Sequence, residues 1–268
     1  MGAVNYVIMR QSPQWRAFDL DNTRRFLAKI NWPEDMIIEF ASAWNASFSV
    51  SFLEFRARVK EISIDNFLSI DDSVLVFLSQ HQGDSALKAL EDAIPEDAIV
   101  LFSDDDDWFH PQIFRRIQNR IWADGCYWDH LFTGLIEVEI PAQNLRNVTL
   151  LRRKGEPMLF TNNYALTGAA VRRLGLKQVA EHYDTQTAIR EQWLKIDPVE
   201  AYLSAANKHP CSSTAIYHNR TDPSIYRDLR THIVRYYHTL KSIELDADSL
   251  WLKPSLDQMI ALVGLVLR

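Results

Sequence analysis

Short apolar runs separated by helical patterns mark the first half of the chain. Three of them have the length of a buried strand: residues 6–9 (YVIM), 73–78 (SVLVFL) and 98–102 (AIVLF). Between the last two, Asp84 or Ser85 can cap a helix that runs through Ala93 and is broken by Pro95. Strand, helix and strand in this order predict right-handed βαβ units and a parallel sheet with helices on its faces.

Other segments of this half carry different patterns. Residues 22–40 have apolar positions at helical intervals, interrupted by one proline, and predict one or two helices. Residues 47–58 (SFSVSFLEFRAR) alternate in their first half, as half-buried strands do. Every fourth residue from Phe109 to Ile121 is apolar, which predicts a helix over residues 110–122 with one apolar stripe.

The second half is less regular. Residues 131–140 and 147–152 predict strands. The segment 158–175 (MLFTNNYALTGAAVRRLG) predicts a strand, a turn and a helix that Thr167 caps and Gly175 ends.

From residue 185 onward, helical patterns dominate the chain. The last stretch, 256–268 (LDQMIALVGLVLR), predicts a helix that packs on the domain or docks on a partner protein, a neighbouring domain or a membrane surface. We find no internal repeat and no Gly/Ser linker. We therefore expect one α/β domain, with a mostly parallel central sheet flanked by helices and a helical C-terminal part.

Composition narrows the class of protein. Among 268 residues, 47% are hydrophobic, which is typical of a folded chain, and the net charge of −6 argues against a nucleic-acid partner. Two cysteines, Cys126 and Cys211, are too few for a disulfide framework. The N-terminus has no basic leader followed by an apolar stretch, and no run of 18 apolar residues occurs, so we expect a cytoplasmic protein.

Four consecutive aspartates, 104–107, follow the apolar run 98–102. In open α/β sheets, ligands bind at the carboxyl ends of the strands, which is where these aspartates would lie. Carboxylates suit Mg²⁺ or Mn²⁺, and either Asp104 with Asp106 or Asp105 with Asp107 could reach one ion from an extended stretch. A solvated acidic loop before a helix N-terminus is the alternative interpretation.

The segment from 83 to 114 (GDSALKALEDAIPEDAIVLFSDDDDWFHPQIF) resembles the metal-binding core of the GT-A-type glycosyltransferases. Their DxD motif follows a strand and is often written as three aspartates, two or three apolar residues and a proline, a form that residues 105–111 (DDDWFHP) match. The resemblance makes Asp105 and Asp107 the metal-binding pair, with Asp104 and Asp106 as the alternative frame. It extends over residues 73–122 and, more loosely, over 159–175. At the N-terminus, YVIMRQSP replaces the family's Pro-Thr-hydroxyl pattern.

The resemblance implies a GT-A-like fold and a metal-dependent glycosyltransferase of the hexosyl- or deoxyhexosyl-transferring type. Its donor would be a nucleotide-sugar, its acceptor a saccharide or glycan of bacterial surface polysaccharide synthesis, and its cofactor Mn²⁺ or Mg²⁺. The ion would neutralise the charge that grows on the leaving diphosphate. Residues 1–125 would form the nucleotide- and metal-binding half, 126–220 the acceptor side and 221–268 a helical segment.

Further site residues follow from the resemblance. His218 could complete the metal shell, with His209 as the other choice, although a lone histidine is more often structural. Arg10, together with Asp104 and Asp105, would bind the cofactor, and Arg10 could meet the base or a phosphate. An inverting enzyme needs a carboxylate base, for which Asp184 and Glu181 lie at a suitable distance along the chain, and each could equally be a solvated helix charge.

Two rival interpretations remain open. FDLDNT, residues 18–23, has the form of the nucleophile loop of haloacid-dehalogenase-like phosphatases, but no good strand precedes it, and Asp21 or Asn22 could simply cap a helix. The second rival is a non-catalytic transferase-like domain that binds a sugar or a partner.

Overall fold

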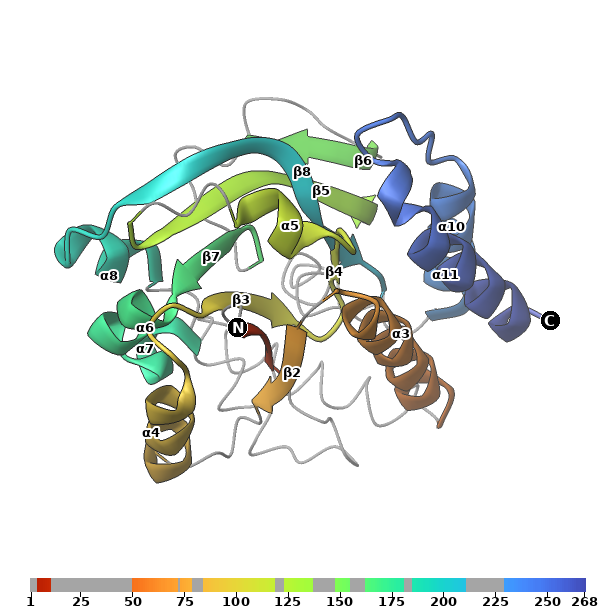
Figure 1. Cartoon of the computed structure of the whole chain (residues 1–268). Coiled ribbons are helices and arrows are strands. Elements are labelled where there is room, and N and C mark those ends of the chain that lie inside the picture. Colours follow the sequence, from red (N-terminus) through yellow and green to blue (C-terminus); the bar gives the residue numbers. More distant parts are fainter. Residues whose placement is uncertain are drawn as a thin grey trace, which may run out of the picture.

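The structure is a computed structural model, and it describes residues 4–10, 50–71, 73–78, 84–118, 123–136, 148–154, 162–180, 185–210 and 229–268. Its centre is a sheet with the strand order β2-β1-β3-β7-β5-β8-β4, in which β6 also pairs with β5 (Figure 1). The strands are β1 (Asn5–Arg10), β2 (Ser73–Leu78), β3 (Ile99–Asp104), β4 (Trp108–Phe109), β5 (Gly125–Ile136), β6 (Val148–Arg153), β7 (Tyr164–Thr167) and β8 (Ile196–Lys208).

Helices cover both faces of the sheet, and the C-terminal helices lie at one end of it (Figure 1). They are α3 (Val50–Leu68), α4 (Asp84–Ala93), α5 (Ile113–Ile117), α6 (Gly168–Leu174), α7 (Leu176–Ala180), α8 (Thr185–Glu191), α10 (Leu229–Lys241) and α11 (Lys253–Val266), with a 3₁₀ turn η2 (Leu250–Leu252) before the last. Within the described ranges, none of these helices is both long and apolar enough to cross a membrane.

The order of the first three strands creates a switch point in the sheet. β1 lies between β2 and β3 and runs parallel to both. The chain first adds β2 on one side of β1 and then, after α4, adds β3 on the other side. The strand order therefore reverses between β1 and β3, and in open α/β sheets ligands bind at such a reversal, beside the carboxyl ends of the strands.

Successive residues of the central strands are buried on opposite faces. Val7 and Met9 of β1 pack in one cluster with side chains of α3 and α5, whereas Ile8 packs in another with side chains of α6, α7 and α8. Neighbouring side chains of a strand point to opposite faces, so a strand covered on both sides needs apolar residues throughout. This explains the unbroken apolar runs YVIM and IVLF.

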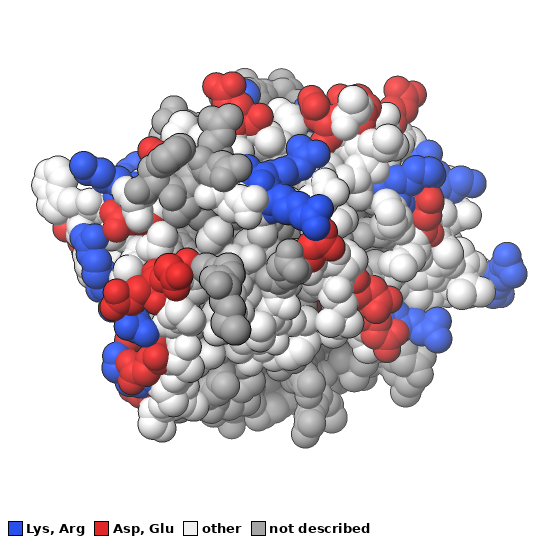
Figure 2. Space-filling view, viewed as in Figure 1, with Lys and Arg blue, Asp and Glu red and all other residues white. Residues whose placement is uncertain are grey.

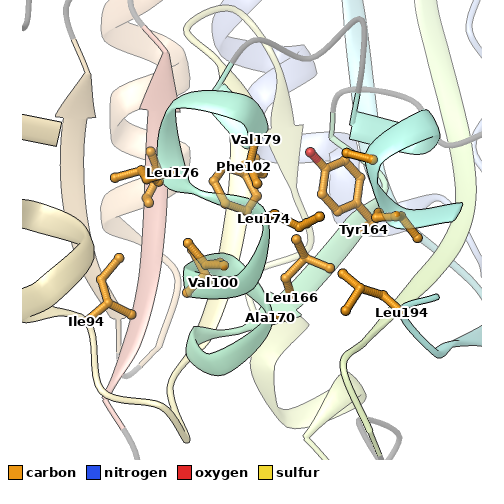
Figure 3. Close-up of a cluster of buried hydrophobic side chains, with 14 of the residues drawn as sticks. Ile94, Val100, Phe102, Tyr164, Leu166, Ala170, Leu174, Leu176, Val179 and Leu194 are labelled. Atoms are coloured by element: carbon orange, nitrogen blue, oxygen red, sulfur yellow. The ribbon is translucent and has the colours of Figure 1, made fainter. Parts of the chain in front are cut away.

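A hydrophobic cluster under α6 and α7 packs the second half of the chain against β3. Val100 and Phe102 of β3 and Tyr164 and Leu166 of β7 meet the side chains of the two short helices (Figure 3). The rings of Phe102 and Tyr164 are stacked, with their centroids 5.8 Å apart. β3 is thereby held between β1 on one edge and β7 on the other.

A separate core holds the C-terminal helices. α10 and α11 pack on α3 and on the far end of the sheet through a cluster that includes Phe55, Trp108, Tyr236 and Met259. The predicted packing of the last apolar stretch on the domain is confirmed, since α11 contributes five buried residues: Ser255, Leu256, Met259, Leu262 and Val263.

Several predicted elements are confirmed. The three apolar runs of the first half are β1, β2 and β3, and the helix before Pro95 is α4. Thr167 caps α6, since its hydroxyl accepts a hydrogen bond from the amide of Ala170 at 3.1 Å, and Gly175 ends that helix with a φ of 83°. The α/β class, the flanking helices and the helical C-terminal part are also confirmed.

The structure corrects three local predictions. The alternation in residues 47–58 does not make a strand from Val50 onward, because Phe55, Val59 and Ile62 face the core from one side of α3. The stripe that starts at Phe109 is not all helix, because Trp108 and Phe109 pair with β8 as β4, and α5 begins only at Ile113. The described residues 185–210 are not mainly helical, because β8 follows the short helix α8.

The long strand β8 is the element that the helical interpretation missed. Its sequence, IDPVEAYLSAANK, is rich in good helix formers, but it pairs along β5 from Ile196 to Lys208. Tertiary pairing overrides such local propensity. The sheet is also more mixed than expected, since β7 runs antiparallel to both β3 and β5, while β5 and β8 are parallel.

Candidate functional site

The acidic run begins at the switch point between β1 and β3. Arg10, the last residue of β1, is the register partner of Asp104, the last residue of β3. Nε of Arg10 lies 3.2 Å from Oδ1 of Asp104, and the Asp104 side chain keeps 32% of its surface exposed. The two residues thus form an ion pair at the carboxyl edge of the sheet, and their expected part in binding the cofactor stays a prediction.

Helix α3 supplies the partner of Asp105. The ammonium group of Lys60 forms an ion pair with the carboxylate of Asp105, whose side chain is almost completely buried. A buried carboxylate is stable only when it is paired or hydrogen-bonded. Asp105 is thus held by the protein itself.

Asp106 meets a histidine from the other end of the chain. His209 directly follows β8 and is fully buried, and its Nε2 lies 3.0 Å from Oδ2 of Asp106. In the neutral imidazole, Nε2–H donates to that oxygen, and a divalent cation bound by both atoms would replace the proton. The contact spans 103 residues of sequence.

The surroundings of this pair determine its protonation states. Burial raises the pKa of Asp106, but the hydrogen bond and charge of His209, with the charges of Lys208 and Arg56, outweigh it, and the net pKa is lowered. Burial lowers the pKa of His209 more than the hydrogen bond and charge of Asp106 raise it. Near neutral pH, the pair therefore consists of an ionised carboxylate and a neutral imidazole, the forms that ligate metals.

Asp107 is bound by two asparagines. The side-chain amide of Asn162 donates to Oδ2, and the backbone N–H of Asn207 donates to Oδ1 at 3.2 Å. Burial raises the pKa of Asp107 well above its usual range, and the charges of Asp106 and Asp104 raise it further. This carboxyl therefore holds its proton more tightly than an ordinary aspartate does. It joins the acidic run to β8 and to the residues before β7.

Beyond the aspartates, Phe109 is fixed on both sides. Trp108 and Phe109 pair with β8 on one side. On the other side, the amide of Asn66 in α3 takes the place of a neighbouring strand: its Nδ2 donates to the carbonyl of Phe109 at 3.0 Å, and the amide of Phe109 donates to its Oδ1 at 2.8 Å. The acidic run is thus a bend with a paired strand at each end.

Exposure alternates along the run. Asp104 and Asp106 are partly exposed, whereas Asp105 and Asp107 are buried. The pair that the resemblance puts forward, Asp105 with Asp107, is thus the pair that protein groups occupy. The alternative pair, Asp104 with Asp106, faces outward next to Arg10 and His209.

A divalent cation at this donor set would need further ligands from a bound molecule or water. Within the described ranges, no group of three or more His, Cys, Asp or Glu side chains could hold a metal ion by itself. Mg²⁺ ions of phosphate-binding sites are commonly held by only one or two carboxylates, together with substrate phosphates and water, and an imidazole nitrogen suits Mn²⁺. Asp106 with His209 provides two such donors.

The remaining predicted residues have different outcomes. His209, the second choice for a metal-binding histidine, lies in the site. His218, Asp184 and Glu181 lie outside the described residues, as does FDLDNT (18–23), so their roles stay predictions.

Sequence reasoning missed the residues that hold the aspartates. Lys60, Asn162 and Asn207 come from three segments, and none of them follows a motif. The one available signal for these residues was the helical spacing of polar residues between apolar ones in α3. The exposed face of an ordinary helix has the same pattern, so it did not single them out.

One face of the molecule carries charged side chains of both signs, unlike the acidic run of residues 104–107. Figure 2 shows basic and acidic side chains interspersed over the described part of this face. Arg152 is paired with Asp246, Lys154 with Asp129 and Arg115 with Asp71.

Comparison with known proteins gives no family. No protein-family model matches the chain, and no curated protein matches it. One of the solved structures that it resembles is a protein assigned as a glucose-1-phosphate thymidylyltransferase, from Bacillus anthracis, in complex with sucrose. That alignment covers 84% of this chain and 96% of the other, with 14% identity and a TM-score of 0.29. At this TM-score and identity, the likeness assigns neither a family nor a function to the chain.

Proposed function

We propose that the chain is a transferase that uses a nucleotide-sugar and a divalent cation, Mn²⁺ or Mg²⁺, and that it transfers the sugar to a saccharide or glycan acceptor. The observation that carries the proposal is the pair of Asp106 and His209. It unites a carboxylate from the end of β3 with an imidazole from the end of β8, next to the β1–β3 switch point.

Each protein group has a defined task in this proposal. Asp106 and His209 would hold the cation, which supplies Lewis-acid stabilisation of the diphosphate leaving group when bound. Arg10 orients Asp104 through their ion pair, and Lys60 holds Asp105. With the hydrogen bonds of Asn162 and Asn207 to Asp107, these contacts preorganise the loop before substrate arrives.

The acceptor side remains part of the proposal only through the resemblance. Asp184 or Glu181 would act as the base in an inverting reaction, and a retaining reaction would not need either. The sugar, the nucleotide and membership in bacterial surface polysaccharide synthesis are expectations of the same kind.

A ligand panel tests the proposal. Thermal unfolding would be measured with UDP-, GDP- and TDP-sugars, each with and without Mn²⁺. We expect one nucleotide class to raise the melting temperature only when Mn²⁺ is present, since the cation and the diphosphate bind together. Hydrolysis of a generic phosphate ester with Mg²⁺, without stabilisation by any nucleotide-sugar, would favour the phosphatase. Equal stabilisation by a free sugar without Mn²⁺ would favour the non-catalytic binding domain.

A further inference from the structure

Helix α3 presents a stripe of polar side chains to the acidic run. Arg56, Lys60, Ser63 and Asn66 follow one another at intervals of four, three and three residues, which puts them on one side of the helix. Three of them are buried, and Lys60 is largely buried. Buried polar groups cost free energy unless they find partners, so this stripe needs partners in the protein or in a ligand.

Two members of the stripe are satisfied by the acidic bend. Lys60 is paired with Asp105, and Asn66 binds the backbone of Phe109. Arg56 is different. Its side chain is 5% exposed, and neither Nη1 nor Nη2 has a hydrogen-bond partner within the described part of the chain. An unpaired buried guanidinium is costly enough to require an explanation.

Arg56 lies near the proposed cation pair. Its positive charge lowers the pKa of both Asp106 and His209. The ring of the adjacent Phe55 packs edge-on to the ring of His209, with the centroids 6.2 Å apart. This turn of α3 therefore borders the Asp106–His209 pair.

Two buried amides beside Asp107 are also half satisfied. Asn207 accepts a hydrogen bond from Tyr236, but its Nδ2 has no partner among the described residues. Asn162 donates to Asp107, but its Oδ1 has no partner there either. A ligand that offers anionic oxygens to Arg56 and Asn207, and a donor to Asn162, would satisfy all three.

The charges around the run permit an anion to bind. Four cationic side chains act on three of the four carboxyls: Arg10 on Asp104, Lys60 on Asp105, and both Arg56 and Lys208 on Asp106. The run that looks strongly acidic in the sequence is therefore compensated in the fold.

We propose that Arg56 binds a phosphoryl group through its guanidinium fork, with the side-chain amide of Asn207 as a second donor. The planar fork of arginine matches phosphate oxygens in pairs, and such charge-assisted bonds are among the strongest hydrogen bonds in proteins. That this group belongs to the diphosphate of a nucleotide donor rests on the proposed function; the anion site itself does not.

Inorganic pyrophosphate without metal is the direct probe, with binding measured by calorimetry. We expect wild type to bind it, and Arg56→Met to weaken binding about 10-fold or more, since a hydrogen-bonded charge is lost. Without ligand, Arg56→Met should melt at or above the temperature of wild type, because an unpaired buried charge is removed. The exposed Arg58 of the same helix provides the control, Arg58→Met, which should change neither value.

Wild type that does not bind pyrophosphate, or Arg56→Met that binds it as tightly as wild type, would overturn the proposal. If Arg56→Met fails to fold, Arg56→Gln decides, and unchanged pyrophosphate affinity in that variant again overturns it. Two further binding measurements identify the ligand. UDP should compete with pyrophosphate, whereas a preference for orthophosphate over both would contradict a diphosphate. Mn²⁺ binding should persist in Arg56→Met, so failure of the cation site and failure of the anion site are distinguishable.

Discussion

At the scale of single residues, Asn66 shows how one side chain can replace a strand. Its amide makes two hydrogen bonds to the backbone of Phe109 inside the protein, on the edge of β4 that no described strand covers. Without it, a buried N–H and a buried carbonyl next to the acidic run would lose their partners.

We therefore expect Asn66→Ala to lower the free energy of unfolding by about 2–3 kcal/mol, the typical cost of leaving buried polar groups unsatisfied. Urea denaturation would measure it. Asp65→Ala, one position away on the exposed side of α3, is the matched control and should change the value little. Equal stability of the two variants would mean that Asn66 does not hold β4.

His110, directly after β4, gives a residue-scale prediction about pH. Burial lowers the pKa of this histidine to about 4, and the charge of Arg116 contributes to the shift. The unfolded chain would titrate near its ordinary value of 6.5 and so binds the proton more readily. Stability should therefore fall as the pH drops from about 6.5 to about 4.

Titration of the His110 ring by NMR would measure this pKa directly, and His110→Gln should flatten the pH dependence of the melting temperature over the same range. A midpoint for His110 near 6.5 would contradict its burial beside β4.

The candidate site was only partly predictable from residues. Asp104 to Asp107 and Arg10 could be located because each follows an apolar run, and sheet topology brings the ends of such runs together. His209 could be named only as one of two histidines, because a lone histidine gives no distance signal. Arg56, Lys60, Asn162 and Asn207 reach the site through tertiary packing, which no local pattern encodes.

At the scale of elements, α6 packs so closely against the segment before β3 that one glycine of α6 has no room for a side chain. A Cβ atom on Gly168 would lie 1.9 Å from the carbonyl oxygen of Pro95. Gly264, inside α11, has more room, since the nearest atom to its added Cβ is a ring carbon of Tyr237 at 3.7 Å.

The two alanine substitutions should therefore have opposite effects. Gly168→Ala should lower the unfolding free energy by about 2–3 kcal/mol through overpacking. Gly264→Ala should raise it by about 0.5–1 kcal/mol, because alanine favours a helix interior. Chemical denaturation of both variants checks this, and a neutral Gly168→Ala would show that α6 can move away from Pro95.

Elements whose ends are encoded by residues close together in the sequence could be predicted. Elements that form only by pairing with a distant strand could not. The cap at Thr167 and the stop at Gly175 lie within one continuous segment, so their chemistry is readable from sequence. β8 becomes a strand because β5 lies beside it over its whole length, and that information lies some 70 residues away. The two residues of β4 likewise form a strand only through β8 and Asn66.

At the scale of the whole molecule, the site lies where the two halves of the sheet meet. β3 belongs to the parallel half with β1 and β2, and β8 belongs to the half with β5. The acidic run connects β3 to β4, so Asp106 and His209 come together only when both halves are assembled. The division of residues 1–268 into nucleotide, acceptor and helical segments stays a prediction.

The proposed function requires that Asp106 and His209 hold a divalent cation together with a diphosphate. Calorimetric titration of Mn²⁺ in the presence of UDP tests it most directly, for wild type, Asp106→Asn, His209→Gln and the control Asp97→Asn. Asp97 is exposed just before β3, at the opposite end of that strand. Asp105 and Asp107 are less suitable targets, because both are buried and hold the bend in place.

We expect Asp106→Asn and His209→Gln each to weaken Mn²⁺ binding at least as much as the loss of an outer-shell partner does, about 10–100-fold. Asp97→Asn should bind Mn²⁺ like wild type. If both site variants bind Mn²⁺ with wild-type affinity, the Asp106–His209 pair is not a cation site and the proposed function is wrong.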